Sequence, residues 1–300
     1  MPKSRSTRRK KKAAPSTAVG PVSDLRSMES FLGLLGGRGK RDVVADAQDI
    51  MYKAWDATAH QQRVALARKA LAVSSLCADA YVLLAEESAR TLDEALDLYR
   101  KGVQAGERAL GKAAFKEDAG HFWGLLETRP YMRARHGLAQ ALWAAGRRDE
   151  TVDHYQDMLR LNPNDNQGIR YLLLNCLLEL GRDADAAELL RQYKDDGAAA
   201  WAYSEALLLF RREGDGKASR AALNRAVKAN AHVPAYLCGR KNLPRELPAL
   251  IGMGDKDEAV AYVHDAASAW AAARGATAWL DAAAADTLAA PTAGPPVKKR

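Results

Sequence analysis

The stretch from Met132 to Pro163 constrains the fold more than any other part of the chain. Its apolar residues follow the period of two helices, with Leu138 in the first, Tyr155 in the second and Gly146 between them. A glycine just past a helix ends it in a left-handed turn, and a proline cannot continue a helix interior. We therefore predict two antiparallel helices, the first ending before Gly146 and the second before Pro163.

This spacing resembles a tetratricopeptide repeat (TPR), a helix pair of about 34 residues that stacks against its neighbours. The pattern recurs, because Gly146 and Gly181 are both followed by arginine and lie 35 residues apart. The expected fold class is all-α: a right-handed α-α superhelix, that is, a TPR-like solenoid of antiparallel helix pairs. The clearest repeats are predicted at 132–165, 166–197 and 198–234, with degenerate pairs at 42–77 and 78–110 and a C-terminal cap at 255–284.

The net charge of +8 is concentrated at the two ends of the chain. Residues 1–23 carry seven basic side chains and no acid, and the last ten residues carry three more, which leaves −2 for the rest. Residues 1–23 and 285–300 have few large apolar side chains, so both are predicted to be disordered tails around a folded repeat domain at 24–284. Residues 25–37 either cap this domain or form a free amphipathic segment.

The basic run at residues 3–12 has two interpretations. It is either a flexible solubilising tail, or a segment that neutralises phosphates and so binds nucleic acid or an anionic membrane without sequence preference. The run contains no aromatic residue on which a base could stack. Nucleic-acid contact is therefore expected to be weak, and a nucleic-acid-associated factor is the alternative function.

Cysteine usage and hydropathy indicate the compartment. Cys77, Cys176 and Cys238 lie far apart, so a disulfide framework is not expected. The sequence contains no apolar run of about 18 residues and no apolar core of a secretion signal near its N-terminus. We expect a cytoplasmic protein without a membrane span.

Three segments carry a more specific resemblance: Ala80–Glu87 (AYVLLAEE), Ala229–Leu237 (ANAHVPAYL) and Gly254–Tyr262 (GDKDEAVAY). In this order they resemble the suppression-of-tumorigenicity-seven family of TPR-like proteins, over roughly Asp42 to Trp279. Animal members of that family carry membrane-spanning segments upstream, where this chain has a short polar tail. The compact length favours a bacterial relative. The family has no established reaction, so the resemblance implies a helical repeat scaffold.

Candidate binding residues follow from the repeat class, in which the first helix of each unit lines the concave face. In the two central repeats this face holds polar and aromatic side chains, among them Arg133 and Arg170, whose guanidinium groups match a carboxylate in two parallel hydrogen bonds. The alternative is a solvated polar face without a ligand. The candidate protein-binding residues on this face are Arg133, His136, Gln140, Trp143, Gln167 and Arg170, and Arg129 of the connection at 120–131 is a further candidate.

The connection at 120–131 breaks the helical period and gathers Phe122, Trp123 and Arg129. One interpretation is a binding element in which the two aromatic residues anchor the loop and Arg129 meets a partner. The other is a packing plug that fills the space where the repeat spacing is interrupted.

Signatures of catalysis are not found in the sequence. It has no glycine-rich phosphate loop, no His-Glu-x-x-His helix, no Cys-x-x-Cys pair and no Gly-x-Ser-x-Gly elbow, and its six histidines are dispersed. We expect no catalytic residues, no metal and no cofactor. The predicted function is a non-enzymatic scaffold that binds a protein or peptide partner in the concave groove of the solenoid.

Overall fold

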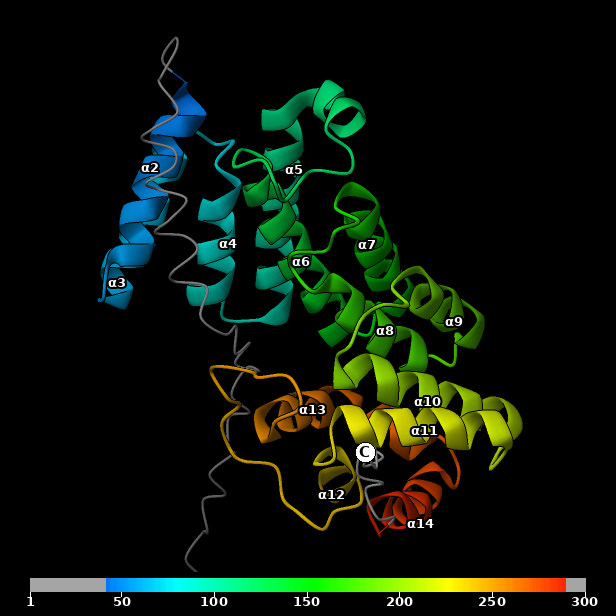
Figure 1. Cartoon of the computed structure of the whole chain (residues 1–300). Helices are drawn as coiled ribbons and strands as arrows, with labels where there is room; N and C mark the ends of the chain where they lie inside the picture. Colours follow the sequence, from blue (N-terminus) through cyan, green and yellow to red (C-terminus); the bar gives the residue numbers. More distant parts are fainter. Residues whose placement is uncertain (1–41, 290–300) are drawn as a thin grey trace, which may run out of the picture. The chain divides into compact units, whose positions relative to one another are not determined.

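The computed structural model describes residues 42–289, and within them the secondary structure is entirely helical (Figure 1). The predicted tail at 1–23, the segment at 25–37 and residues 290–300 of the tail predicted at 285–300 lie outside the described residues, whereas residues 285–289 of that predicted tail are helical. The chain forms two compact units. The first holds the described residues up to Ala109 together with Arg133–Gly146, and the second holds Leu110–Met132 and the residues from Arg147 onward.

The first unit is built on α2, α3 and α4, with the N-terminal part of α5 and most of α6. α2 begins where the carboxylate of Asp42 accepts a hydrogen bond from the Val44 N–H at 2.9 Å, which satisfies a free helix N-terminal donor. Met51 and Val64 are buried in the core of these helices, and Trp55 packs against their cluster. The helices are α2 (Val43–Asp56), α3 (His60–Val73), α4 (Ala78–Glu87), α5 (Leu92–Glu117) and α6 (Arg129–Ala144).

Close approach of α5 and α6 in the first unit depends on Gly137. A Cβ atom at this position would lie 2.1 Å from Cε1 of the buried Tyr99, so only glycine leaves room for the ring. α5 itself extends past the end of the helix pair predicted at 78–110. Its backbone kinks at Gly111, where φ is +72°, and residues 112–117 continue as helix because they are good helix formers.

The second unit holds the remaining helices. The turn glycines Gly146 and Gly181 adopt φ values of +77° and +70°, as the repeat pattern predicts. α13 packs against α8 and α10, and α14 packs against α11. α10 and α11 run side by side as one pair (Figure 1). The helices are α7 (Arg148–Leu161), α8 (Ile169–Glu179), α9 (Asp183–Gln192), α10 (Ala199–Glu213), α11 (Lys217–Ala229), α12 (Val233–Leu237), α13 (Lys256–Ala272) and α14 (Ala276–Ala289).

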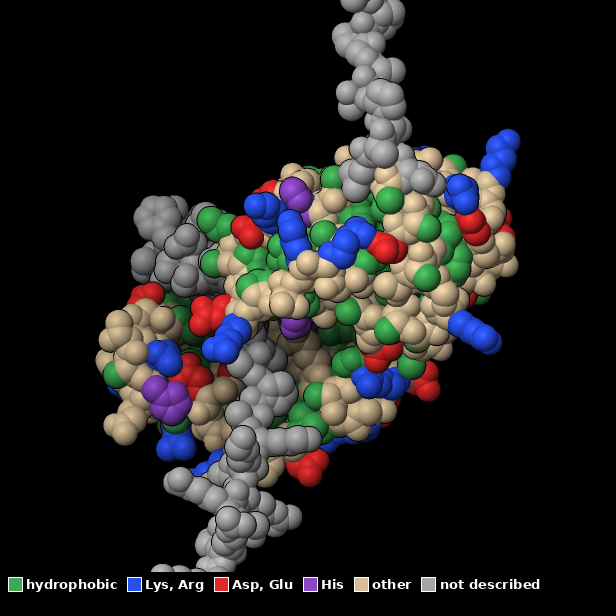
Figure 2. Space-filling view, turned by 90° about the horizontal axis from the view of Figure 1, so that it is seen from below, with side chains coloured by type: hydrophobic (Ala, Val, Ile, Leu, Met, Phe, Trp, Pro, Cys, Tyr) green, Lys and Arg blue, Asp and Glu red, His purple; other side chains and the backbone are tan. Residues whose placement is uncertain are grey.

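These helices confirm the predicted fold class, an all-α, TPR-like α-α superhelix of antiparallel pairs. Two elements are additional. α12 is a short helix that carries Pro234 near its start. Proline is tolerated there because it lacks an N–H group, and the first N–H groups of a helix have no partner within the helix. α14 follows α13 as a separate helix and continues to Ala289. On the face seen in Figure 2, acidic and basic side chains are interspersed with apolar ones, in keeping with the small net charge between the tails.

The aromatic loop at 120–131 is packed within the second unit. The Gly120 and Phe122 N–H groups donate to the Leu161 carbonyl at 2.9 and 3.2 Å. The Phe122 ring is fully buried and lies 6.1 Å from the ring of Tyr131, which is also buried. Arg129 is held within the loop, with its Nε donating to the Trp123 carbonyl at 2.9 Å and its guanidinium 5.3 Å from the centre of the Trp123 ring. These contacts favour the packing interpretation of the loop.

Candidate functional site

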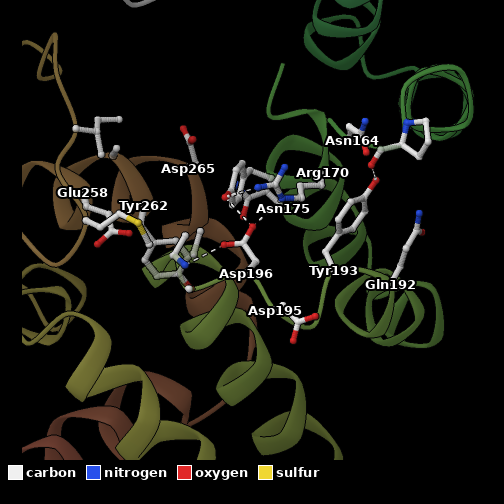
Figure 3. A pocket seen from close by; sticks show the side chains of 18 residues that line it. Asn164, Arg170, Asn175, Gln192, Tyr193, Asp195, Asp196, Glu258, Tyr262 and Asp265 are labelled. Atoms are coloured by element: carbon white, nitrogen blue, oxygen red, sulfur yellow. Dashed lines mark hydrogen bonds and ion pairs between the residues drawn. The ribbon is translucent and has the colours of Figure 1, made fainter. Parts of the chain in front are cut away.

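A groove of about 840 Å³ opens in the second unit. Most of its lining comes from α8, the link between α9 and α10, the loop before α13, and α13 itself, and the turn before α8, the end of α9 and the start of α10 complete it. Figure 3 shows Glu258, Tyr262 and Asp265 of α13 on one side, and Arg170, Asn175 and Tyr193 on the other. The lining residues are Pro163, Asn164, Arg170, Tyr171, Asn175, Gln192, Tyr193, Asp195, Asp196, Gly197, Ala198, Ala200, Ile251, Met253, Glu258, Ala261, Tyr262 and Asp265.

Arg170 is the centre of an ionic network at the start of α8. Its Nε donates to Asp196 at 2.7 Å, and its Nη1 donates to the carboxylate and the carbonyl of Asp165 at 3.0 and 3.3 Å. Its Nη2 donates to the Tyr171 hydroxyl at 2.9 Å. Four of the five N–H donors of a guanidinium are thus used by the protein itself. Arg170 therefore fixes one wall of the groove.

Asp165 and Asp196 also hold backbone groups, at the start of α8 and just before α10 respectively. Asp165, at φ +47°, accepts from the Ile169 and Arg170 N–H groups at 2.7 and 2.9 Å, so its carboxylate caps a helix whose own N-cap is a glycine. Asp196 accepts from the Ala198 N–H at 2.9 Å. Burial acts to raise the pKa of Asp196, but the hydrogen bonds from Ala198, Tyr171 and Arg170 outweigh it and lower the pKa below its ordinary value. Asp196 is therefore a stable anion.

Aromatic rings line the same wall. The Arg170 guanidinium lies 4.5 Å from the centre of the Tyr171 ring and 5.4 Å from that of Tyr193. Both tyrosines meet the buried Trp201 ring edge to face, at 5.6 and 6.1 Å. The Tyr193 hydroxyl donates to the Pro163 carbonyl at 2.9 Å. The rings are thus held in place before any ligand arrives.

The opposite wall is fixed by Glu258, which is 7% exposed. Its carboxylate accepts three hydrogen bonds: from the Ala199 N–H at 2.8 Å, from Asn230 Nδ2 at 2.9 Å and from the Gly254 N–H at 2.7 Å. Asp255 caps α13 beside it by accepting from the Glu258 N–H at 2.9 Å. Glu258 thereby ties the start of α13 to α10 and to the end of α11.

The rim of the groove is less constrained. Asp195 is exposed, and Asp265 is 48% exposed, with a hydrogen bond of 2.8 Å to Nδ1 of the neighbouring His264. Ile251 and Met253 are 58% and 73% exposed, an unusual setting for large apolar side chains. The rim therefore presents negative charge and apolar surface together.

Only Arg170 of the seven predicted site residues is among the residues that line this groove. Gln167 lies in the turn before α8 and is half-buried. Arg129 is the first residue of α6, and its side chain is held against Trp123 of the packed loop described above. Leu174 and Leu177 of α8 are each only 1% exposed, so they do not face the groove. The groove face of α8 passes through Tyr171 and Asn175.

The other four predicted residues, Arg133, His136, Gln140 and Trp143, lie on α6 in the first unit. The guanidinium of Arg133 is buried against Asp79, with Nε–Oδ1 and Nη2–Oδ2 distances of 2.8 and 2.5 Å. Burial lowers the pKa of His136 to about 4, so its imidazole is neutral at pH 7. Arg133 thus serves an internal ion pair.

The lining residues that sequence reasoning missed come from five stretches of the chain: 163–164, 171–175, 192–200, 251–253 and 258–265. Tyr171 and Asn175 lie four positions apart on α8 and so share a face, which the helical period could have revealed. Asp195 and Asp196 look like ordinary turn residues ahead of Gly197. Asp265 carried no local signal, because its role depends on α13 packing against α8.

Two properties bear on the class of protein. Among residues 42–289, no helix is both long and apolar enough to cross a membrane. The described residues also contain no group of three or more His, Cys, Asp or Glu side chains arranged to hold a metal ion.

Comparison with known proteins confirms the family resemblance seen in the sequence. A model of the ST7 protein family matches residues 39–293. The suppressor of tumorigenicity 7 protein-like of Gallus gallus is 31% identical over 257 residues, which cover 78% of this chain and 46% of that protein. The suppressor of tumorigenicity 7 protein of Macaca fascicularis is 29% identical over 281 residues, which cover 78% of this chain and 52% of that protein.

This chain therefore spans about half the length of the curated relatives it matches. Among solved structures, YrrB, described as a TPR protein with an unusual peptide-binding site, is 18% identical with a TM-score of 0.43 over 62% of this chain and 86% of that chain. The family model covers most of the sequence, and the chain belongs to the ST7 protein family.

Proposed function

We propose that the chain is a non-enzymatic interaction scaffold, and that the groove of its second unit holds an extended segment of a partner polypeptide. The observation that carries this proposal is a groove of about 840 Å³ whose walls are fixed by internal hydrogen bonds. That volume is within the range of about 300–1,000 Å³ that is typical of ligand pockets. Walls that are already ordered reduce the entropy lost when a partner binds.

The chemistry of the lining residues suits a peptide better than a reaction. Amide side chains at Asn164, Asn175 and Gln192 offer both donors and acceptors, which is what the main chain of an extended peptide requires. The lining residues include no serine, cysteine, histidine or lysine, and the two less exposed carboxylates, Asp196 and Glu258, already accept hydrogen bonds from the protein itself. These features support binding rather than catalysis.

The proposal is tested by blocking the groove. Ala261 lines the groove on α13, whereas Ala267 lies on the same helix, is exposed and is not a lining residue. We expect peptides selected from a random library by the full chain to bind the wild type and Ala267→Trp equally, and Ala261→Trp at least tenfold more weakly, in fluorescence anisotropy titrations. A library that yields no binder, or binders that tolerate Ala261→Trp, would refute a role for the groove.

Two expectations from the sequence stay predictions. Nucleic-acid contact through residues 3–12 concerns a segment outside the described residues, and it requires that the full chain retard RNA or DNA at low salt. A cytoplasmic location likewise awaits localisation of the tagged protein in its native cell.

A further inference from the structure

The charges around the groove are strongly unequal. Four carboxylates line it, those of Asp195, Asp196, Glu258 and Asp265, against one guanidinium, that of Arg170. Low-dielectric walls focus the field of such charges into the groove and raise the local concentration of ions of opposite sign. The groove therefore attracts cations, although the chain as a whole carries a net charge of +8.

The groove's one arginine cannot offset this field for a ligand. Four N–H groups of Arg170 already donate to Asp165, Asp196 and Tyr171, so at most one remains for a visiting carboxylate. An acidic ligand would meet the surrounding carboxylates without gaining the bidentate contact that makes arginine a good anion receptor. The groove thus disfavours anions.

The four lining carboxylates fall into two groups, those held by several hydrogen-bond donors of the protein and those exposed at the rim. Asp196 is engaged by Arg170, Tyr171 and the backbone, and Glu258 by three N–H donors. Asp195 is exposed, and within residues 42–289 the hydrogen bond of Asp265 goes to the adjacent His264. These two rim carboxylates are the ones accessible to an incoming lysine or arginine.

Apolar surface lies beside the rim carboxylates. Ile251 and Met253 line the groove and are more than half exposed, and the neighbouring Leu250 is 76% exposed. Methionine adapts its shape to different apolar partners because its side chain is unbranched and flexible. A ligand that covers this surface must carry aliphatic or aromatic side chains as well as positive charge.

We propose that the occupant of the groove is a cationic polypeptide segment of a partner protein, whose lysine or arginine side chains meet Asp195 and Asp265 and whose apolar side chains cover Ile251 and Met253. This inference rests on the proposed function and specifies the class of partner. The chain's own N-terminal residues 1–23 supply the charge, but their only large apolar side chains are Met1, Val19 and Val22. They therefore match the negative charge of the groove but not its exposed apolar surface.

The test uses the full-length chain and three labelled peptides of equal length. The first alternates lysine with leucine and phenylalanine, the second replaces lysine with glutamate, and the third replaces the apolar residues with serine. We expect the first to bind at least tenfold more tightly than either of the others at about 50 mM salt, and to weaken as salt rises to about 300 mM. Equal or tighter binding of the second or third peptide overturns the proposal.

Matched variants locate the contact. The double variant Asp195→Asn/Asp265→Asn is expected to bind the first peptide about tenfold or more weakly than the wild type, since each charge removed near the ligand lowers the affinity a few-fold. Asp153→Asn with Glu127→Gln changes the net charge equally at exposed positions away from the groove, and should leave affinity within about twofold. Equal effects of the two pairs would mean that the attraction is unspecific and would overturn the proposal.

Two further outcomes separate the hypotheses. If deleting residues 1–23 tightens binding of the first peptide tenfold or more, the chain's own tail already occupies the groove, and a partner segment is not its occupant. If library-selected peptides are acidic or neutral but still lose binding in Ala261→Trp, the cationic partner is rejected while the proposed function stands. If selected peptides neither prefer positive charge nor lose binding in Ala261→Trp, both the cationic partner and the proposed function are rejected.

Discussion

The ion pair between Arg133 and Asp79 makes the sharpest prediction about stability. Asp79 is fully buried, and its carboxylate accepts two hydrogen bonds from Arg133 and one from Gln48 Nε2 at 2.7 Å. The Arg133 guanidinium also lies 5.3 Å from the centre of the Trp55 ring. Arg133→Met keeps most of the side-chain volume but leaves a buried carboxylate with one of its three hydrogen bonds.

Removing one partner of a buried pair typically lowers the free energy of unfolding by about 3–5 kcal/mol. Hydrogen exchange followed by mass spectrometry measures this for the first unit separately, because local opening limits the exchange of protected amides. We expect amides of α2 and α4 to exchange roughly 100- to 4,000-fold faster in Arg133→Met. Amides of α10 and α11, in the second unit, provide the internal reference.

Two controls make the result interpretable. Arg68→Met removes an exposed arginine of α3 and should change stability by less than about 0.5 kcal/mol. Arg133→Met combined with Asp79→Leu removes both charges and should recover most of the lost stability, since replacing a whole buried pair by apolar residues is often neutral. Exchange in Arg133→Met within about threefold of the wild type would refute the assignment of this pair as a main support of the first unit.

Three more predictions concern single positions. Gly137→Ala should lower the urea midpoint by the equivalent of about 1–3 kcal/mol, although alanine normally stabilises a helix, because its Cβ would collide with Tyr99; an unchanged or higher midpoint contradicts this. His136 titrates near pH 6.5 when unfolded and at about 4 when folded, so stability is full above pH 6.5 and falls by up to about 3 kcal/mol as the pH drops to 4. In urea titrations His136→Phe should lack that part of the pH dependence, and an unaltered dependence would exclude His136 as its source. With a thiol reagent at pH 8, the half-buried Cys238 should react before the buried Cys77, whose pKa is raised to about 12 by burial; the reverse order would be inconsistent with the packing.

Much of the helix layout follows from local signals in the sequence. The turns at Gly146 and Gly181 and the end of α7 ahead of Pro163 are fixed by the conformations those residues allow. The sequence pattern does not predict α14 as a separate helix, because alanine is so frequent from 276 to 289 that no apolar stripe distinguishes one face. Alanine content predicts helix there, but not where a helix starts.

The site was far less predictable than the helices. The groove combines α8 with the distant α13, and no local pattern couples Asn175 to Asp265. Arg133 illustrates the same limit, since its partner Asp79 lies 54 residues away in an earlier helix pair. An arginine on the inner helix of a repeat looks alike in sequence whether it faces solvent or a buried acid.

Two of the four acidic residues that line the groove support the backbone and two lie at the rim, and this difference has an evolutionary consequence. Asp196 and Glu258 hold neighbouring backbone in place, so a mutation at either risks the fold along with the groove. Among the described residues, Asp195 and Asp265 make no comparable bond to the backbone, and Asp265 hydrogen-bonds the adjacent His264, so both can be substituted without disturbing this framework. A lineage could therefore reverse the electrostatic preference of this pocket through two substitutions at its edge, while the framework that shapes it stayed intact.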